Sequence, residues 1–140
     1  MQPDFIWRGS IPVSDNRVPD PRTPVVLVVS ADANLRAASA RVLQKEGYHV
    51  LTAAHSGHAV LACRKAGRID LLATDLCMDD LSGPALSARL ARHCPEMRTV
   101  YFANPGTHEC EGVLVRPFTR DDLLAALAAA PIGAGVTSAY

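Results

Sequence analysis

The sequence predicts an α/β domain in which helices cover both faces of a parallel sheet. Strand-like and helix-like segments alternate along the chain from residue 25 onward. Residues 25–29 form an unbroken run of valine and leucine, which is typical of a strand buried on both faces. Strand–helix–strand units connect through right-handed crossovers, so we expect helices on both sides of the sheet.

The helix boundaries are marked by capping residues. Asp32 is an N-cap candidate for the first helix, and Gly47 can end that helix in the left-handed conformation. Gly67 does the same for the second helix, while Thr119 and Asp122 have the spacing of a capping box. We therefore expect strands over residues 25–29, 48–53, 69–75, 99–103 and 113–116, and helices over 32–46, 56–65, 84–93 and 119–130.

The segment between the fourth and fifth strands lacks a helical pattern. Residues 104–112 contain one proline and two glycines and show no apolar periodicity. We therefore expect a loop at this place instead of a helix.

The chain divides into three parts: an extended or disordered arm over residues 1–24, a domain over 25–130 and a flexible tail over 131–140. Five of the ten prolines lie in the arm and disfavour both helix and central strand. The arm also holds Phe5, Ile6 and the only tryptophan, Trp7. Such large apolar side chains favour packing against another surface.

Composition excludes several classes of function. Fourteen basic residues balance fourteen acidic ones, and without a basic excess we expect no direct nucleic-acid binding. No apolar run is long enough to span a membrane, and no signal peptide is visible. The four cysteines form no C-x-x-C pair, which favours a reducing, cytoplasmic setting. Hydrolase and nucleotide-binding motifs are missing, so we do not expect an enzyme.

The segment from residue 25 to about 130 resembles the receiver domain of two-component response regulators. The similar stretches are residues 26–29, residues 69–76 with Asp75 near their end, the Leu-Ser-Gly loop at 81–83, and Leu-Val-Arg-Pro-Phe at 114–118. The resemblance implies a flavodoxin-like, CheY-like fold with strand order 2-1-3-4-5. In this chain, the loop at 104–112 would replace the fourth helix.

The resemblance implies a crevice at the carboxyl ends of the strands, with Asp75 as phosphoryl acceptor. The family has two adjacent acidic residues after the first strand that help to hold Mg²⁺, whereas this chain has Ser30 and Ala31. Asp32 lies one residue further on and, with Asp75 and the backbone carbonyl of Cys77, is a candidate metal ligand. Because two carboxylates are lost, we expect weak magnesium affinity.

Three further crevice positions depart from the family pattern. Ala103 stands where the family has a hydroxyl residue, and Val113 stands at its aromatic switch position. Arg116 replaces the family lysine with a planar guanidinium, which is not an equivalent group. Asp75 is thus either a phosphoryl acceptor or a structural partner of Arg116, and such a pairing would lower the pKa of Asp75.

Two functions follow from the resemblance. One is an atypical single-domain receiver that accepts a phosphoryl group from a histidine kinase or phosphotransfer protein and acts through protein–protein contact. The alternative is a phosphorylation-independent pseudo-receiver that serves as an interaction or dimerisation module. We also expect a homodimer, because the missing helix would uncover apolar side chains on residues 99–102 and 113–115. The predicted contact residues are Phe5, Ile6, Trp7, Val113 and Val115.

Other groups carry weaker alternatives. Asp79 and Asp80 are either replacement oxygen ligands or solvated loop residues. His55 and His58 are either a metal pair or, more simply, solvent-facing side chains. The apolar neighbours of Cys63 and Cys77 favour a place in the core for both thiols.

Overall fold

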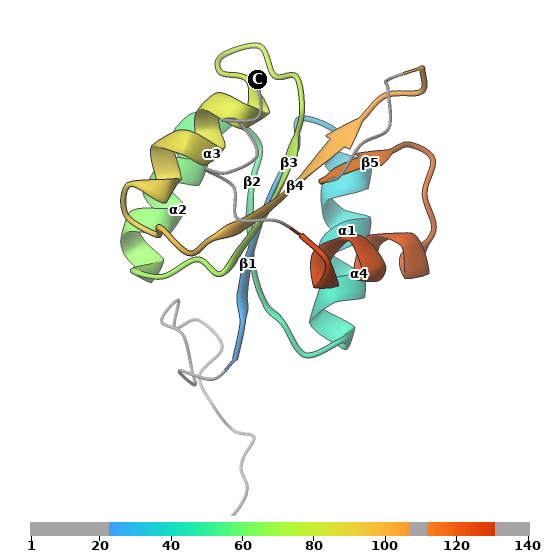
Figure 1. Cartoon of the computed structure of the whole chain (residues 1–140), viewed down its shortest axis with the longest axis horizontal. Helices are drawn as coiled ribbons and strands as arrows, with labels where there is room; N and C mark the ends of the chain where they lie inside the picture. The colour runs from blue at the N-terminus through green and yellow to red at the C-terminus, as the bar shows by residue number, and fades with distance from the viewer. Residues whose placement is uncertain (1–22, 107–111, 131–140) are drawn as a thin grey trace, which may run out of the picture.

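The computed structural model describes residues 23–106 and 112–130. A parallel sheet with the order β2-β1-β3-β4-β5 forms the centre of the domain, as the sequence and the resemblance predict (Figure 1). Its strands are β1 (Val25–Val29), β2 (His49–Ala53), β3 (Leu71–Asp75), β4 (Arg98–Ala103) and β5 (Val113–Val115). The helices are α1 (Ala33–Lys45), α2 (Ser56–Ala66), α3 (Gly83–Ala91) and α4 (Arg120–Ala128).

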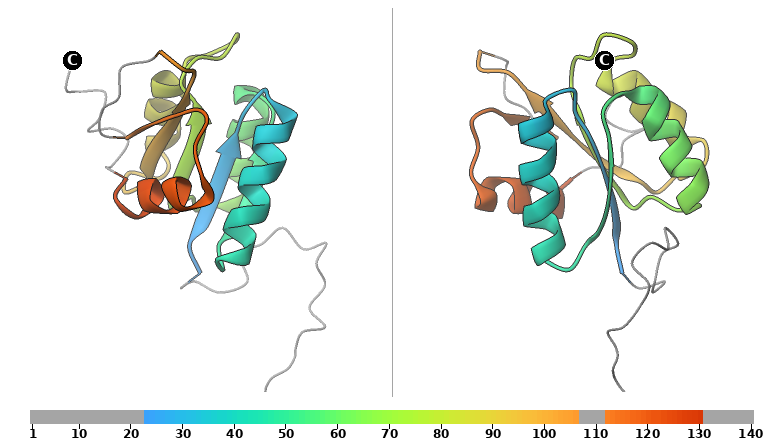
Figure 2. Two further views of the ribbon diagram at one scale, coloured as in Figure 1. Left: turned by 90° about the vertical axis from the view of Figure 1, so that its right-hand side faces the viewer. Right: turned by 180° about the vertical axis from the view of Figure 1, so that it is seen from behind.

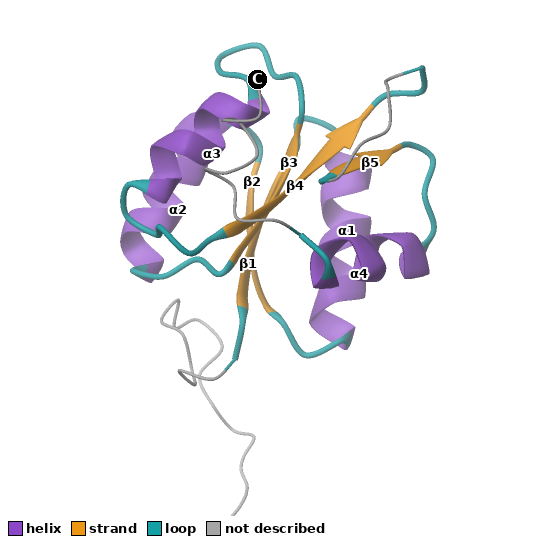
Figure 3. Ribbon diagram, viewed as in Figure 1, coloured by secondary structure: helices purple, strands orange, loops and turns teal. Residues whose placement is uncertain are grey.

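Two helices cover each face of the sheet. Figures 2 and 3 show α1 and α4 on one side and α2 and α3 on the other. Alternate residues of β1 supply the two cores: Val25 and Leu27 face the α2–α3 side, and Val26 and Val28 face the α1–α4 side. Every residue of β1 is buried, which explains its unbroken apolar sequence.

The predicted helix signals act as expected. The Asp32 side chain accepts the backbone N–H of Asn34 and Leu35 and caps α1. Gly67 ends α2 with φ of 77°, a left-handed conformation that favours glycine. Thr119 and Asp122 form a reciprocal capping box at the start of α4. The N-caps Asp32 and Thr119 fix where the loops after β1 and β5 end, at the carboxyl edge of the sheet.

No helix lies between β4 and β5 in the described part of the chain, but the expected exposure of β4 is wrong. Thr99 is fully buried beneath α3, where its hydroxyl and that of Ser87 form a hydrogen bond of 2.9 Å. On the other face Phe102 stacks with Phe118, with ring centroids 5.5 Å apart. The helices α3 and α4 thus cover β4 without the missing helix. Of the two strands that were expected to be uncovered, β5 is half-buried and keeps partly exposed apolar side chains.

The predicted contact residues Phe5, Ile6 and Trp7 lie outside the described residues, as does the 131–140 tail. Among the described residues, no helix is long and apolar enough to cross a membrane.

Candidate functional site

The carboxyl ends of the inner strands surround a pocket of about 210 Å³. This is the place where open α/β sheets bind ligands, because neighbouring loops diverge there. The residues that line it are Ala31, Asp32, Asp75, Leu76, Cys77, Phe102, Ala103, Asn104 and Arg116. The structure therefore brings together the crevice residues that the sequence predicts, and Ser30 joins them through a hydrogen bond to Asp75.

Asp75 ends β3 and is held by the loop that follows β1. Its Oδ2 accepts the Ser30 hydroxyl at 3.1 Å and the Ala31 backbone N–H at 3.0 Å. The substituted positions at 30 and 31 thus donate to the carboxylate, where acidic side chains would repel it. Both bonds end on Oδ2, and Oδ1 is the oxygen left for an incoming group.

Asp32 has both carboxylate oxygens engaged. Oδ1 caps α1, and Oδ2 accepts Arg116 Nη1 at 3.0 Å. The N–H of Leu35 is the largest cause that lowers the pKa of Asp32, and the Arg116 guanidinium adds to it. Asp32 is therefore an anion already satisfied by the protein's own donors.

Arg116 bonds Asp32, so the predicted pairing of Asp75 with Arg116 is wrong. The second guanidinium nitrogen, Nη2, donates to the Asn104 side-chain oxygen at 3.4 Å. Asn104 and Asp32 lie at the edge of the pocket and hold the guanidinium there. Sequence reasoning missed Asn104, although its place directly after β4 was a usable signal.

The loop after β3 is tied to α2. Asp80 Oδ2 accepts the Ser56 backbone N–H at 3.2 Å and also the Ser56 hydroxyl. The hydroxyl bond is the largest cause that lowers the pKa of Asp80. Asp80 thus anchors the loop to the first residue of α2 while its side chain stays exposed, as expected of a solvated loop residue.

The remaining candidates form no site. His55 caps α2, its ring lies 4.0 Å from that of His58, and no group of three metal-ligating side chains occurs among the described residues. Cys63 is buried as predicted, 3.9 Å from the Cys94 sulfur. Cys77 is exposed, which corrects the predicted core position: it follows β3 at the pocket rim.

A family model for the response regulator receiver domain matches residues 26–128. The chain therefore belongs to the response-regulator receiver family of two-component signalling.

Solved structures agree with this membership, whereas no curated protein matches the chain. The chemotaxis protein CheY4 of Vibrio cholerae is 26% identical, with a TM-score of 0.65 over 76% of this chain and 97% of that one. A receiver domain protein of Clostridium thermocellum is 23% identical, with a TM-score of 0.63 over 75% and 91% of the two chains. A receiver protein of Sinorhizobium medicae, at 19% identity and a TM-score of 0.67, covers 78% and 94%. The last two show the fold alone.

Receiver domains commonly bind Mg²⁺, but the residues of this crevice do not fit the ion. Mg²⁺ demands an octahedral oxygen shell and binds through one or two carboxylates in addition to waters. With Arg116 in place Asp32 offers no free carboxylate oxygen, because Oδ1 caps α1 and Oδ2 accepts the guanidinium. In this arrangement Asp75 Oδ1 is the one crevice carboxylate oxygen among the described residues without a hydrogen bond, and the Arg116 guanidinium lines the same pocket.

Proposed function

We propose that this receiver takes part in a phosphorelay, with Asp75 as phosphoryl acceptor and protein–protein contact as output. The observation that carries the proposal is the placement of Asp75 and Arg116 on one pocket. Asp75 Oδ1 attacks the phosphorus of a phosphohistidine, the P–N bond breaks as the O–P bond forms, and the leaving imidazole takes up a proton from water. The chain is then the acceptor in this step and not an enzyme with an external substrate.

Arg116 supplies positive charge for this step. Its ion pair with Asp32 is exposed, and the side chains are 32% and 43% accessible. Exposed ion pairs contribute about 0–1 kcal/mol, so the guanidinium can leave Asp32 at little cost. A phosphorylated Asp75 carries more negative charge than a carboxylate and offers a guanidinium several acceptor oxygens. We therefore expect Arg116 to turn from Asp32 to the phosphoryl group.

The donor protein has an apolar surface to bind beside the crevice. A groove of about 420 Å³ lies between α1 and the segment that joins β5 to α4, and Arg116 lines both the groove and the crevice. Leu35, Val42 and Phe118 are among its lining residues. A histidine kinase or phosphotransfer protein that brings its imidazole to Asp75 would cover this groove.

A phosphorylation-independent pseudo-receiver is the second candidate, and the engaged state of Asp32 favours it. Among the described residues the crevice has no free acidic ligands for Mg²⁺, and Ala103 stands in place of a hydroxyl donor. Few groups are therefore present to stabilise the negative charge on the phosphoryl oxygens in the transition state. In this case the fold acts as an interaction module. A homodimer through the half-buried β5 edge, with Val113 and Val115 in the contact, remains a prediction of either function.

Acetyl phosphate treatment with and without Mg²⁺, followed by intact-mass spectrometry, distinguishes the two candidates. A phosphoryl adduct on the wild-type protein, absent from Asp75→Asn, supports the first function. A Ser30→Asp/Ala31→Asp variant restores the acid pair and serves as the positive control. An adduct on this variant and none on the wild-type protein contradicts the phosphorelay function and supports the pseudo-receiver. An adduct on neither protein also contradicts the phosphorelay function.

A further inference from the structure

The strand β2 presents an open edge. It pairs with β1 on one side, and no described strand lies on the other. His49 donates its backbone N–H to the Pro24 carbonyl, at 3.0 Å, so this N–H points toward β1. Since N–H direction alternates along a strand, the N–H groups of Val50 and Thr52 point to the open edge. Unpaired groups of this kind are a template for another strand.

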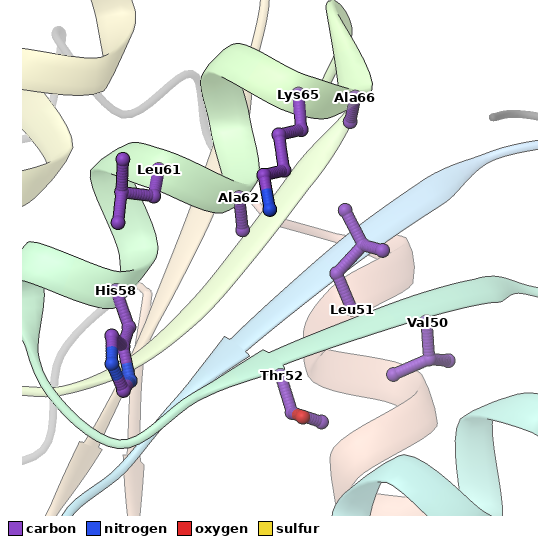
Figure 4. A pocket seen from close by; sticks show the side chains of 8 residues that line it. All are labelled: Val50, Leu51, Thr52, His58, Leu61, Ala62, Lys65 and Ala66. Carbon is purple, nitrogen blue, oxygen red and sulfur yellow. The ribbon is translucent and has the colours of Figure 1, made fainter. Parts of the chain in front are cut away.

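A groove lies between this edge and α2 (Figure 4). Its volume is about 540 Å³, and β2 lines one wall. The other wall is a helical stripe of α2 that includes Leu61, Ala62 and Lys65. Leu61 is 52% exposed and is the one large hydrophobic side chain described as exposed. The groove thus places the apolar Leu61 and Ala62, together with polar side chains such as Lys65, beside backbone donors that no described strand pairs.

The N-terminal arm joins the domain next to this edge. The Pro24 carbonyl accepts the backbone N–H of His49, the first residue of β2, at 3.0 Å. The preceding carbonyl, that of Thr23, accepts a hydrogen bond from Arg68 in the connection between α2 and β3. Only β2 separates β1 from the open edge, a shift of about 10 Å at two strand spacings. Residues 12–22 can span up to about 36 Å, so the segment before them reaches the groove easily.

The sequence of the arm fits an added strand. Residues 4–11 contain no proline, whereas Pro3 and Pro12 flank them. This window is longer than the five-residue β2 and holds Phe5 and Trp7 two positions apart. In a strand, side chains two positions apart lie on the same face.

We propose that residues 4–11 pair with β2 of the same chain as an antiparallel edge strand, with Phe5 and Trp7 in the groove against Leu61. An antiparallel strand needs the shortest connection, because it ends near the start of β1. The tether raises the local concentration of the arm over that of a second copy. The placement differs from the sequence-based expectation of packing on β5, because α3 and α4 already cover the neighbouring β4.

The single tryptophan makes the proposal directly measurable in the full-length protein. We expect Trp7 emission at short wavelength and protection from acrylamide quenching. Leu61→Glu places a charge in the groove at an exposed position, so the fold is retained while Trp7 emission shifts to that of water-exposed indole. Ala37→Glu, on an exposed position of α1 outside the groove, is the matched control and should leave Trp7 unchanged. Amide exchange at Val50 and Thr52 should accelerate in the Leu61→Glu variant only.

Three outcomes would overturn the proposal. The first is water-like Trp7 emission in the wild-type protein. A second is protected Trp7 that Leu61→Glu does not release, which places the arm elsewhere. The third is protection that disappears on dilution together with a fall in mass by light scattering, which assigns the groove to the arm of a second copy.

Discussion

Replacement of Gly83 by alanine should destabilise the domain at the crevice. Gly83 is the first residue of α3, and a Cβ added there would lie 2.4 Å from the Asp75 carbonyl oxygen and 2.9 Å from the Tyr101 ring. Ordinary van der Waals contact begins at 3.4 Å, so the overlap with backbone is about 1 Å. Overpacking costs about 1–3 kcal/mol, and contact with a fixed strand favours the upper part of this range.

Helix propensity alone predicts the opposite sign, a gain of about 0.5–1 kcal/mol for alanine in place of glycine. We expect a net loss of roughly 2 kcal/mol, equivalent to about 10 °C in the melting temperature of a domain of this size. Urea unfolding followed by circular dichroism measures the difference. The matched control is Gly57→Ala in α2, where the nearest atoms belong to the His55 ring at 3.2 Å, a side chain that can turn away. Equal stability of Gly83→Ala and the wild-type protein would refute the reasoning.

Three further predictions concern charge, thiols and buried hydroxyls. Because Asp32 has a lowered pKa in the folded state, its contribution to stability is present above the unfolded pKa and is lost as the pH falls through the lowered one. In an Asp32→Asn variant, which keeps a capping oxygen, the free energy of unfolding should fall less steeply as the pH is lowered. Urea unfolding at a series of pH values measures this dependence. Burial raises the pKa of the Cys63 thiol to about 11, so iodoacetamide at pH 8 should modify the exposed Cys77 before Cys63. Peptide mass spectrometry should show that Cys63 reacts only after denaturation. Ser87→Ala leaves the buried Thr99 hydroxyl without its partner and should cost about 1–3 kcal/mol in urea unfolding, and Ser87→Ala with Thr99→Val should recover part of that loss.

The sequence predicts the strands well because runs of apolar, β-branched residues indicate that a strand is buried. The five-residue run of valine and leucine in β1 is stable only between two helical layers. Of the loop predicted over 104–112, residues 104–106 and 112 form no helix, and residues 107–111 lie outside the described part of the chain. The ion-pair partner of a given side chain is harder to predict, because it depends on which groups of neighbouring strands and loops that side chain can contact. Arg116 was expected at Asp75 and bonds Asp32, since the N-cap carboxylate projects over the same pocket.

The same limit explains the mistaken exposure of β4. A missing helix suggests an uncovered strand only if the neighbouring helices stay at their usual places. Here α3 meets Thr99 through Ser87, and Phe118 before α4 stacks on Phe102. These contacts depend on how far two helices reach laterally, which no local pattern encodes.

The crevice engages both of its carboxylates with the protein's own hydrogen-bond donors. With Ser30 and Ala31 in place of an acid pair, the loop after β1 donates hydrogen bonds to Asp75, and the next carboxylate, Asp32, becomes a helix cap. Arg116 then pairs with Asp32, whereas the donors to Asp75 among the described residues are the neutral Ser30 hydroxyl and Ala31 N–H. A switch in this receiver must therefore begin with Arg116 leaving Asp32, because that exposed pair is the contact that a new negative charge on Asp75 would compete with. If phosphorylation of Asp75 leaves the Arg116 guanidinium resonances unchanged by NMR, the crevice has no such switch, and its role is to hold the fold of an interaction module.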